Sequence, residues 1–183
     1  MKKGFILVLA IASIAAMSSC GKKKGPSEAT KQLMSTFETD WKALGEEING
    51  WEATMTSTMS GMTTMMTETR AVELTKLPSD AKAMAETNLM MCTKIEEQMA
   101  AMQTSYATAK SDFASATDAY TAWKKKGQEE HLDDAAIVAE MANWNTKLTE
   151  WKTIATGWNE QLSGMQDACK QTCDAVMGMA PAK

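Results

Sequence analysis

The stretch that decides the fold is residues 137–179, IVAEMANWNTKLTEWKTIATGWNEQLSGMQDACKQTCDAVMGM. Apolar and small residues recur in it at alternating steps of four and three, the spacing that keeps side chains on one face of an α-helix. These residues are Ile137, Met141, Trp144, Leu148, Trp151, Ala155, Trp158, Leu162, Met165, Cys169, Thr172, Val176 and Met179. The pattern predicts one long helix over about 131–178.

Two stripes of the same spacing precede this one. The first consists of Met34, Phe37, Trp41, Leu44, Ile48, Trp51, Met55, Thr58, Met62, Met65, Thr69 and Val72. The second consists of Met91, Ile95, Met99, Met102, Tyr106, Ala109, Phe113, Ala116, Tyr120 and Trp123. The first stripe stays in phase through Asn49-Gly50, so we expect no break there. Pro78 separates the two stripes, and Gly127 is placed as a helix C-cap. The predicted helices are 28–76 and 79–126.

Three helices of similar length joined by short turns predict an all-α fold, an antiparallel up-down-up bundle with coiled-coil-like packing over 28–179. Residues 180–183 form a short tail. A coiled-coil-like oligomer of open helices is the competing architecture.

Turns centred near residues 78 and 128 predict which residues lie level with one another. Trp41 should lie level with Phe113 and Trp144, and Trp51 level with Tyr106 and Trp151. Cys92 should face about residue 164. One half of the bundle is then aromatic, and the other half is rich in Met and Cys.

The first residues predict export. Lys2 and Lys3 precede an apolar run from Gly4 to Met17, which is too short to span a bilayer and is followed by small residues. Met17-Ser18-Ser19-Cys20 resembles the lipobox of bacterial lipoproteins, with Met in place of the usual Leu. The resemblance implies that residues 1–19 are removed and that Cys20 is acylated and anchors the chain in a membrane of the cell envelope. An ordinary secretory signal before an unrelated cysteine is the alternative.

The residues after Cys20 predict its surroundings. Gly21 stands where an Asp would favour the inner membrane in the enterobacterial sorting rule, so the outer membrane is favoured. Residues 20–27 form the lipidated cysteine and a tether. Two groups of lysines should lie near the membrane surface. They are Lys22, Lys23 and Lys24 in the tether, and Lys124, Lys125 and Lys126 at the second turn.

Composition and motifs argue against several functions. Without Lys2 and Lys3, 17 basic side chains stand against 23 acidic ones, a net charge of −6. That charge disfavours nucleic-acid binding. His131 is the only histidine, and we expect it to be an exposed polar residue in a turn. No phosphate loop, dinucleotide fingerprint or haem attachment motif is present. We therefore expect a non-enzymatic protein that needs no cofactor.

The 17 Met and 4 Cys have several interpretations. Met is a flexible core filler. An oxidising compartment would favour a Cys92–Cys169 disulfide, with Cys173 left over. The segment from Met55 to Met66 is similar to the methionine-rich segments of extracytoplasmic copper-handling proteins, since thiolates and thioethers select Cu(I). The ligands would be Met62, Met65, Met66, Cys92, Cys169 and Cys173. A sulfur-rich face for protein contact is a further interpretation.

The functional expectation is a lipid-anchored structural or protein-interaction module of the bacterial envelope, with a protein partner or self-association. The alternative is an envelope protein that binds copper-like soft metal ions. A third hypothesis is a carrier of an apolar ligand, held in a cavity between Trp residues and Ala109, Ala116 and Ala155.

Overall fold

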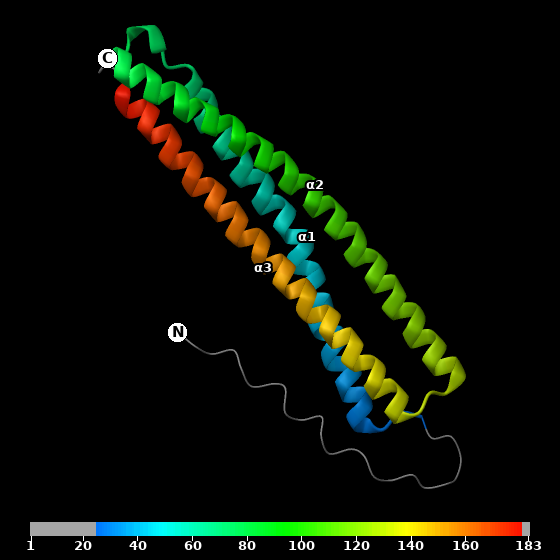
Figure 1. The fold of residues 1–183 in the computed structure, drawn as a ribbon. Helices are drawn as coiled ribbons and strands as arrows, with labels where there is room; N and C mark the ends of the chain where they lie inside the picture. Colours follow the sequence, from blue (N-terminus) through cyan, green and yellow to red (C-terminus); the bar gives the residue numbers. More distant parts are fainter. Residues whose placement is uncertain (1–24, 181–183) are drawn as a thin grey trace, which may run out of the picture.

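The computed structural model describes residues 25–180, which form three long α-helices and one short 3-10 helix. The helices are α1 (Glu28–Arg70), α2 (Ser79–Glu130) and α3 (Asp134–Met179), with the 3-10 helix η1 (Leu74–Lys76) between the first two. They run side by side, with α2 antiparallel to its neighbours (Figure 1). The predicted all-α up-down-up bundle is confirmed. None of these helices has a segment long and apolar enough to cross a membrane.

Polar side chains fix where α1 and α3 begin. Ser27 Oγ accepts a hydrogen bond from the backbone N–H of Thr30, and Asp133 Oδ1 accepts one from the N–H of Ala136. Each side chain satisfies an N–H that the first helical turn leaves without a partner. α1 then continues through residues 49 and 50 without a break, as predicted.

Two helix ends differ from the prediction. α1 ends at Arg70 rather than at residue 76, and the chain then forms η1. α2 continues past Gly127 to Glu130, so the predicted C-cap at Gly127 is wrong. His131 takes the left-handed conformation instead, with φ of 49°, and the N–H of Leu132 donates to the carbonyl of Gly127. That bond is the Schellman pattern of helix termination, and histidine tolerates left-handed backbone better than most residues.

The buried stripes follow the sequence pattern closely. On α3 every predicted position is buried except Trp151 and Met179, which are half-buried. On α2, Met91 is 41% exposed and Cys92 is buried in its place. On α1, Met59 and Met66 are buried where residues 58 and 65 were expected. The α1 stripe takes two consecutive steps of four, 51 to 55 to 59, and this stutter replaces 58 by 59 and 65 by 66, whereas Met62 and Thr69 are buried as predicted.

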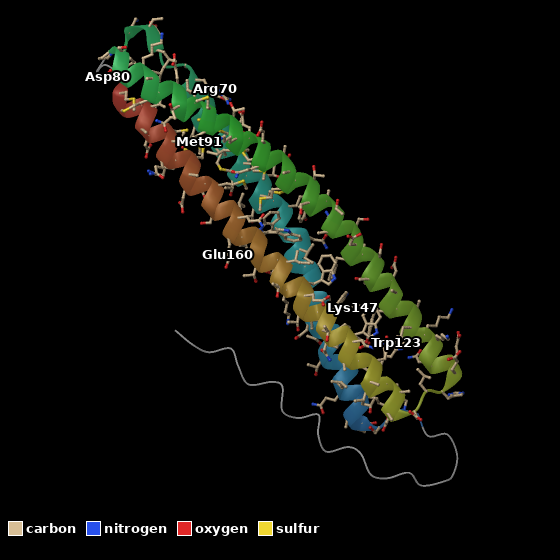
Figure 2. The ribbon with its side chains drawn as sticks, in the orientation of Figure 1. Arg70, Asp80, Met91, Trp123, Lys147 and Glu160 are labelled. Atoms are coloured by element: carbon tan, nitrogen blue, oxygen red, sulfur yellow. The ribbon has the colours of Figure 1, made fainter. Side chains whose placement is uncertain are left out.

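The core divides along its length. Aromatic residues occupy the half near the start of α1, and Met and Cys occupy the half near the end of α3. Figure 2 shows the sulfur atoms gathered in the half that contains Met91 and Arg70, whereas Trp123 lies toward the other end. The backbones of α1 and α3 approach each other along more of their length than those of α1 and α2. The last helix, α3, is therefore the most closely packed neighbour of α1.

Candidate functional site

The register between α2 and α3 determines which functional side chains meet. Three of the four aromatic pairs that join these helices are Phe113–Trp151, Tyr106–Trp158 and Tyr120–Trp144, and in each of these three the residue numbers add to 264. The fourth, Trp123–Trp144, is the widest, with ring centroids 6.4 Å apart. A turn centred at residue 128 would give 256. The observed register corresponds to a turn centred near 132, because α2 continues past Gly127. Each α2 residue therefore faces a partner about eight positions further along α3 than predicted.

Most of the neighbours predicted for Trp41 and Trp51 in the aromatic half are confirmed. Trp41 stacks on Phe113 with ring centroids 4.8 Å apart and meets Trp144 edge to face at 6.3 Å. Trp51 lies 5.1 Å from Tyr106 as predicted, but its partner on α3 is Trp158 rather than Trp151. The shift has the direction expected from the later turn.

Three thiols meet in the sulfur half. Cys92 and Cys169 have no exposed surface, and Cys173 is 4% exposed. The Sγ atoms of Cys169 and Cys173 lie 3.9 Å apart, and Cys169 Sγ lies 3.7 Å from the carbonyl oxygen of Met62. The α2–α3 register places Cys92 opposite Thr172 and Cys173. We call Cys92, Cys169 and Cys173 the thiol cluster.

Burial controls the protonation of the thiol cluster. Desolvation, reinforced by the adjacent Cys173, raises the pKa of Cys92 to about 11 and that of Cys169 to about 12. Both groups therefore hold their protons at neutral pH. A thiol that stays protonated is a poor nucleophile. The cluster is an inert part of the core unless an oxidant or a metal ion removes its protons.

An ion pair lies beside the thiol cluster. Arg70 donates two hydrogen bonds to the Glu96 carboxylate, at 2.6 and 2.7 Å. The Arg70 guanidinium lowers the pKa of Glu96, and its charge also acts on the pKa of Cys92 in the lowering direction, against the larger effect of burial. This bidentate pair joins α1 to α2 and leaves one cation close to the thiols.

The predicted disulfide and metal residues lie near one another. Met62 and Met66 are fully buried on α1, and Met65 is half-buried. All three cysteines of the cluster are free thiols in the structure, so the Cys92–Cys169 disulfide stays a prediction. Within residues 25–180, no three side chains of His, Cys, Asp and Glu form a preformed metal-binding group.

The other end of the bundle is where the chain enters α1. The backbone N–H of Ser27 donates to Asp134 Oδ1 at 2.9 Å, which joins the start of α1 to the start of α3 and lowers the pKa of Asp134. The predicted placement of the second turn beside the chain entry is thus correct. We call this region the entry end. Cys20, Lys22, Lys23 and Lys24 lie outside the described residues.

The lysines of the second turn have acidic neighbours. Lys124 Nζ lies 2.6 Å from Glu38 Oε1 on α1. Lys125 and Lys126 lie 4.0 and 3.7 Å from the carboxylates of residues 129 and 130 on the same helix. Exposed pairs of this kind contribute little to stability, but they reduce the local positive charge. This turn is less basic than its sequence suggested.

A cavity of about 420 Å³ opens at the entry end, between the start of α1 and the end of α2. Sequence reasoning missed it. The apolar cavity was expected near Ala109, Ala116 and Ala155, but Ala155 is buried and the other two are half-buried against the core. The residue in the sequence that comes closest to indicating the cavity is Gly127, which lines it together with Leu132. A Cβ at Gly127 would lie 3.1 Å from Leu132 Cδ1.

His131 is exposed, as expected, and borders this cavity.

Comparison with protein-family models, with curated proteins and with solved structures finds no match to the chain. No relative therefore supplies a function for any of the residues described above.

Proposed function

We propose that this protein is a lipid-anchored, non-enzymatic helical module of the bacterial cell envelope that acts through contacts with another protein or with a second copy of itself. The observation that carries the proposal is the order of the segments along the chain. The lipobox-like Met17-Ser18-Ser19-Cys20 is followed by a short tether and then at once by α1. The outer membrane is the favoured location.

The geometry of the entry end supports an anchor at this position. The hydrogen bond from Ser27 to Asp134 fixes the point where the tether joins the bundle. The second turn lies at the same end, and the thiol cluster lies in the opposite half. A membrane at Cys20 would leave the distal half of all three helices free to meet partners.

Lipidation has a direct test. The full chain is expressed in a bacterium fed an alkyne analogue of palmitate, and labelling and membrane fractionation are compared with the Cys20→Ser variant. We expect label and membrane retention in the wild type and an unlabelled, unprocessed precursor in the variant. Cys173→Ser is the matched control and should be labelled like the wild type. Absence of label on the wild type would refute the anchor.

The interaction role needs a separate measurement. Photo-cross-linking residues replace Met84, Met91 or Met177 in cells, three of the four exposed methionines of the described residues. We expect a discrete cross-linked species with a defined envelope protein or with a second copy of the chain. The same residue at Lys31, at the entry end, is the comparison site. A lipidated chain that remains monomeric at every position would contradict this role.

Soft-metal binding is the second candidate function, and the thiol cluster favours it. Zinc–thiolate bonds of about 2.3 Å place two sulfurs of one tetrahedral ion about 3.8 Å apart. The Cys169–Cys173 separation of 3.9 Å therefore fits two ligands on one ion with little rearrangement. Cys92 and the thioethers of Met62 and Met66 are the nearby soft donors, a set that favours Cu(I).

Anaerobic titration of the reduced protein with Cu(I), against a chromophoric Cu(I) chelator, tests this candidate. We expect one ion per chain and loss of binding in Cys169→Ser and Cys173→Ser. Met177→Leu is the control, because Met177 is 48% exposed and outside the cluster. Failure of the wild type to compete with the chelator would exclude the site.

A further inference from the structure

The cavity at the entry end has an apolar lining with charges on its border. Its apolar side chains are those of Met34, Trp123, Leu132 and Ile137. Its volume of about 420 Å³ lies within the range of about 300–1,000 Å³ typical of small-molecule pockets. Trp123 also lies 5.6 Å from Tyr120 and 6.4 Å from Trp144, so one wall of the cavity belongs to the aromatic core.

Two lysines and one acidic residue supply the charges on the lining. They are Lys31, Lys124 and Glu38. Glu38 Oε1 accepts hydrogen bonds from both Lys124 and Tyr120, and Lys31 Nζ lies 2.6 Å from Glu28 Oε1. An anionic group at this border would meet two ammonium groups, each already in a partly or fully exposed ion pair of the kind that contributes little to stability.

We propose that this cavity binds the acyl chain of a single-chain anionic amphiphile of the fatty-acid class, with its carboxylate beside Lys31 and Lys124. Flexible aliphatic side chains and one indole face suit a methylene chain, and two ammonium groups held only by weak ion pairs suit the head group. The choice of an acyl chain over another apolar group rests on the proposed function, because the cavity lies at the end where the membrane anchor would begin. Gly25 and Pro26 border the cavity directly.

A brominated fatty acid tests the proposal through Trp123. Bromine quenches an indole that it touches, and Trp123 is the only tryptophan on the cavity lining. The full chain carrying Cys20→Ser, which cannot be lipidated, is titrated with stearate dibrominated in mid-chain. We expect saturable quenching that unlabelled stearate reverses. Trp123→Phe should remove most of the quenching, and Trp151→Phe, a half-buried tryptophan outside the lining, should retain it.

Two further variants separate the chain from the head group. Met34→Glu places a charge inside the cavity and should weaken binding of the brominated acid by about tenfold or more, the effect of losing one good interaction. The double variant Lys31→Gln/Lys124→Gln should weaken binding of the acid but leave binding of the corresponding brominated alcohol unchanged. Equal loss for both ligands would overturn the assignment of the head group.

The outcomes distinguish this inference from the proposed function. Absence of saturable quenching, or quenching that survives in Trp123→Phe, overturns the cavity site even if Cys20 is lipidated. Binding by Cys20→Ser but not by the lipidated chain in lipid nanodiscs would mean that the protein's own acyl chain fills the cavity. That result would also overturn the proposal that the cavity binds a separate amphiphile. Absence of lipid on Cys20 would refute the anchor and leave the quenching result valid.

Discussion

Trp41 and Trp144 meet edge to face in the aromatic half, with ring centroids 6.3 Å apart, but only one of the two indole N–H groups has a partner. Trp41 Nε1 donates a 2.9 Å hydrogen bond to Thr117 Oγ1. Trp144 Nε1 is buried without a hydrogen-bond partner, and the Lys147 ammonium lies 4.3 Å from the centroid of its ring. A buried donor without a partner costs about 1–3 kcal/mol.

Trp144→Phe should therefore destabilise the protein less than Trp41→Phe. Both changes remove the same volume, but only the second breaks a hydrogen bond, worth about 1 kcal/mol, and the first removes an unsatisfied N–H. We expect the free energy of unfolding to differ between the variants by about 1–3 kcal/mol. Urea unfolding followed by far-UV circular dichroism measures the difference. Equal destabilisation would mean that the Trp144 N–H has a water partner.

Two glycines of α1 should respond in opposite ways to alanine. A Cβ on Gly61 would meet no atom within 4 Å, so Gly61→Ala should gain about 1 kcal/mol from helix propensity. A Cβ on Gly45 would lie 3.2 Å from Phe113 Cε1, so Gly45→Ala must displace a ring that stacks on Trp41. For a domain of this size we expect Gly61→Ala to raise Tm by about 2–4 °C. Gly45→Ala should give a smaller rise or a loss, and the reverse order would contradict this packing.

The thiol cluster predicts a loss of stability in alkali. Thiols in the unfolded chain lose their protons from about pH 8.5. In the folded chain the pKa values of Cys92 and Cys169 are raised to about 11 and about 12. Between the pKa of a thiol in the unfolded chain and its pKa in the folded chain, the unfolded state binds fewer protons than the folded state. The free energy of unfolding therefore falls as pH rises, by about 1.4 kcal/mol per pH unit for each thiol.

Urea unfolding under reducing conditions between about pH 8 and 10.5 measures this slope. The Cys92→Ala/Cys169→Ala variant is the control, because it keeps the buried tyrosines, which also titrate in alkali. We expect a shallower slope in the control. The same slope in both proteins would show that the thiols titrate normally.

Oxidation should join Cys92 to Cys173 rather than to Cys169. The register of α2 on α3 places Cys92 opposite residues 172 and 173, whereas Cys169 lies one helical turn away. Cys169 and Cys173 are on one helix, where the Cβ directions suit a mutual disulfide poorly. Each thiol gives up a proton and one electron to a disulfide-donating oxidoreductase, whose own disulfide is reduced. Closing a loop of about 80 residues would stabilise the chain by about 4–5 kcal/mol.

Alkylation of free thiols followed by peptide mapping identifies the pair. Cys169→Ser should retain the cross-link, and Cys173→Ser should lose it or change partner. Recovery of a Cys92–Cys169 peptide from the wild type would support the pairing expected from the sequence. A cross-linked chain should also bind Cu(I) more weakly, because two of its three thiolate ligands are consumed.

The sequence predicted the helices well because a stripe of buried side chains is a local property. Thirteen positions of α3 repeat at steps of four and three, and all are buried or half-buried. The continuity of α1 through Asn49 and Gly50 was predictable for the same reason. The stutter after Met55 was not, because Thr58 and Met59 are equally compatible with a helix and only packing against α3 selects between them.

The register was harder to predict because it depends on a single turn. Gly127 is a strong C-cap signal, and a polar residue such as His131 is a weak one. Ending α2 four residues too early moved every α3 partner by about eight positions, which is why Cys92 was expected to face residue 164 and not residue 172. The cavity at the entry end was also beyond the sequence, because it is formed by residues from the tether, α1, α2 and the second turn together.

The close packing of α1 on α3 has a consequence for the time course of folding. The Trp51–Asn159 and Lys152–Asp40 hydrogen bonds join residues 108 and 112 positions apart. Rates of folding fall as contacting residues become more distant in the chain, so this bundle should fold more slowly than helical proteins whose neighbours are sequential. The N-terminal helices emerge first both from the ribosome and from an export channel, so α1 waits for its main partner, α3. A chaperone that shields the apolar stripe of α1 would act in that interval.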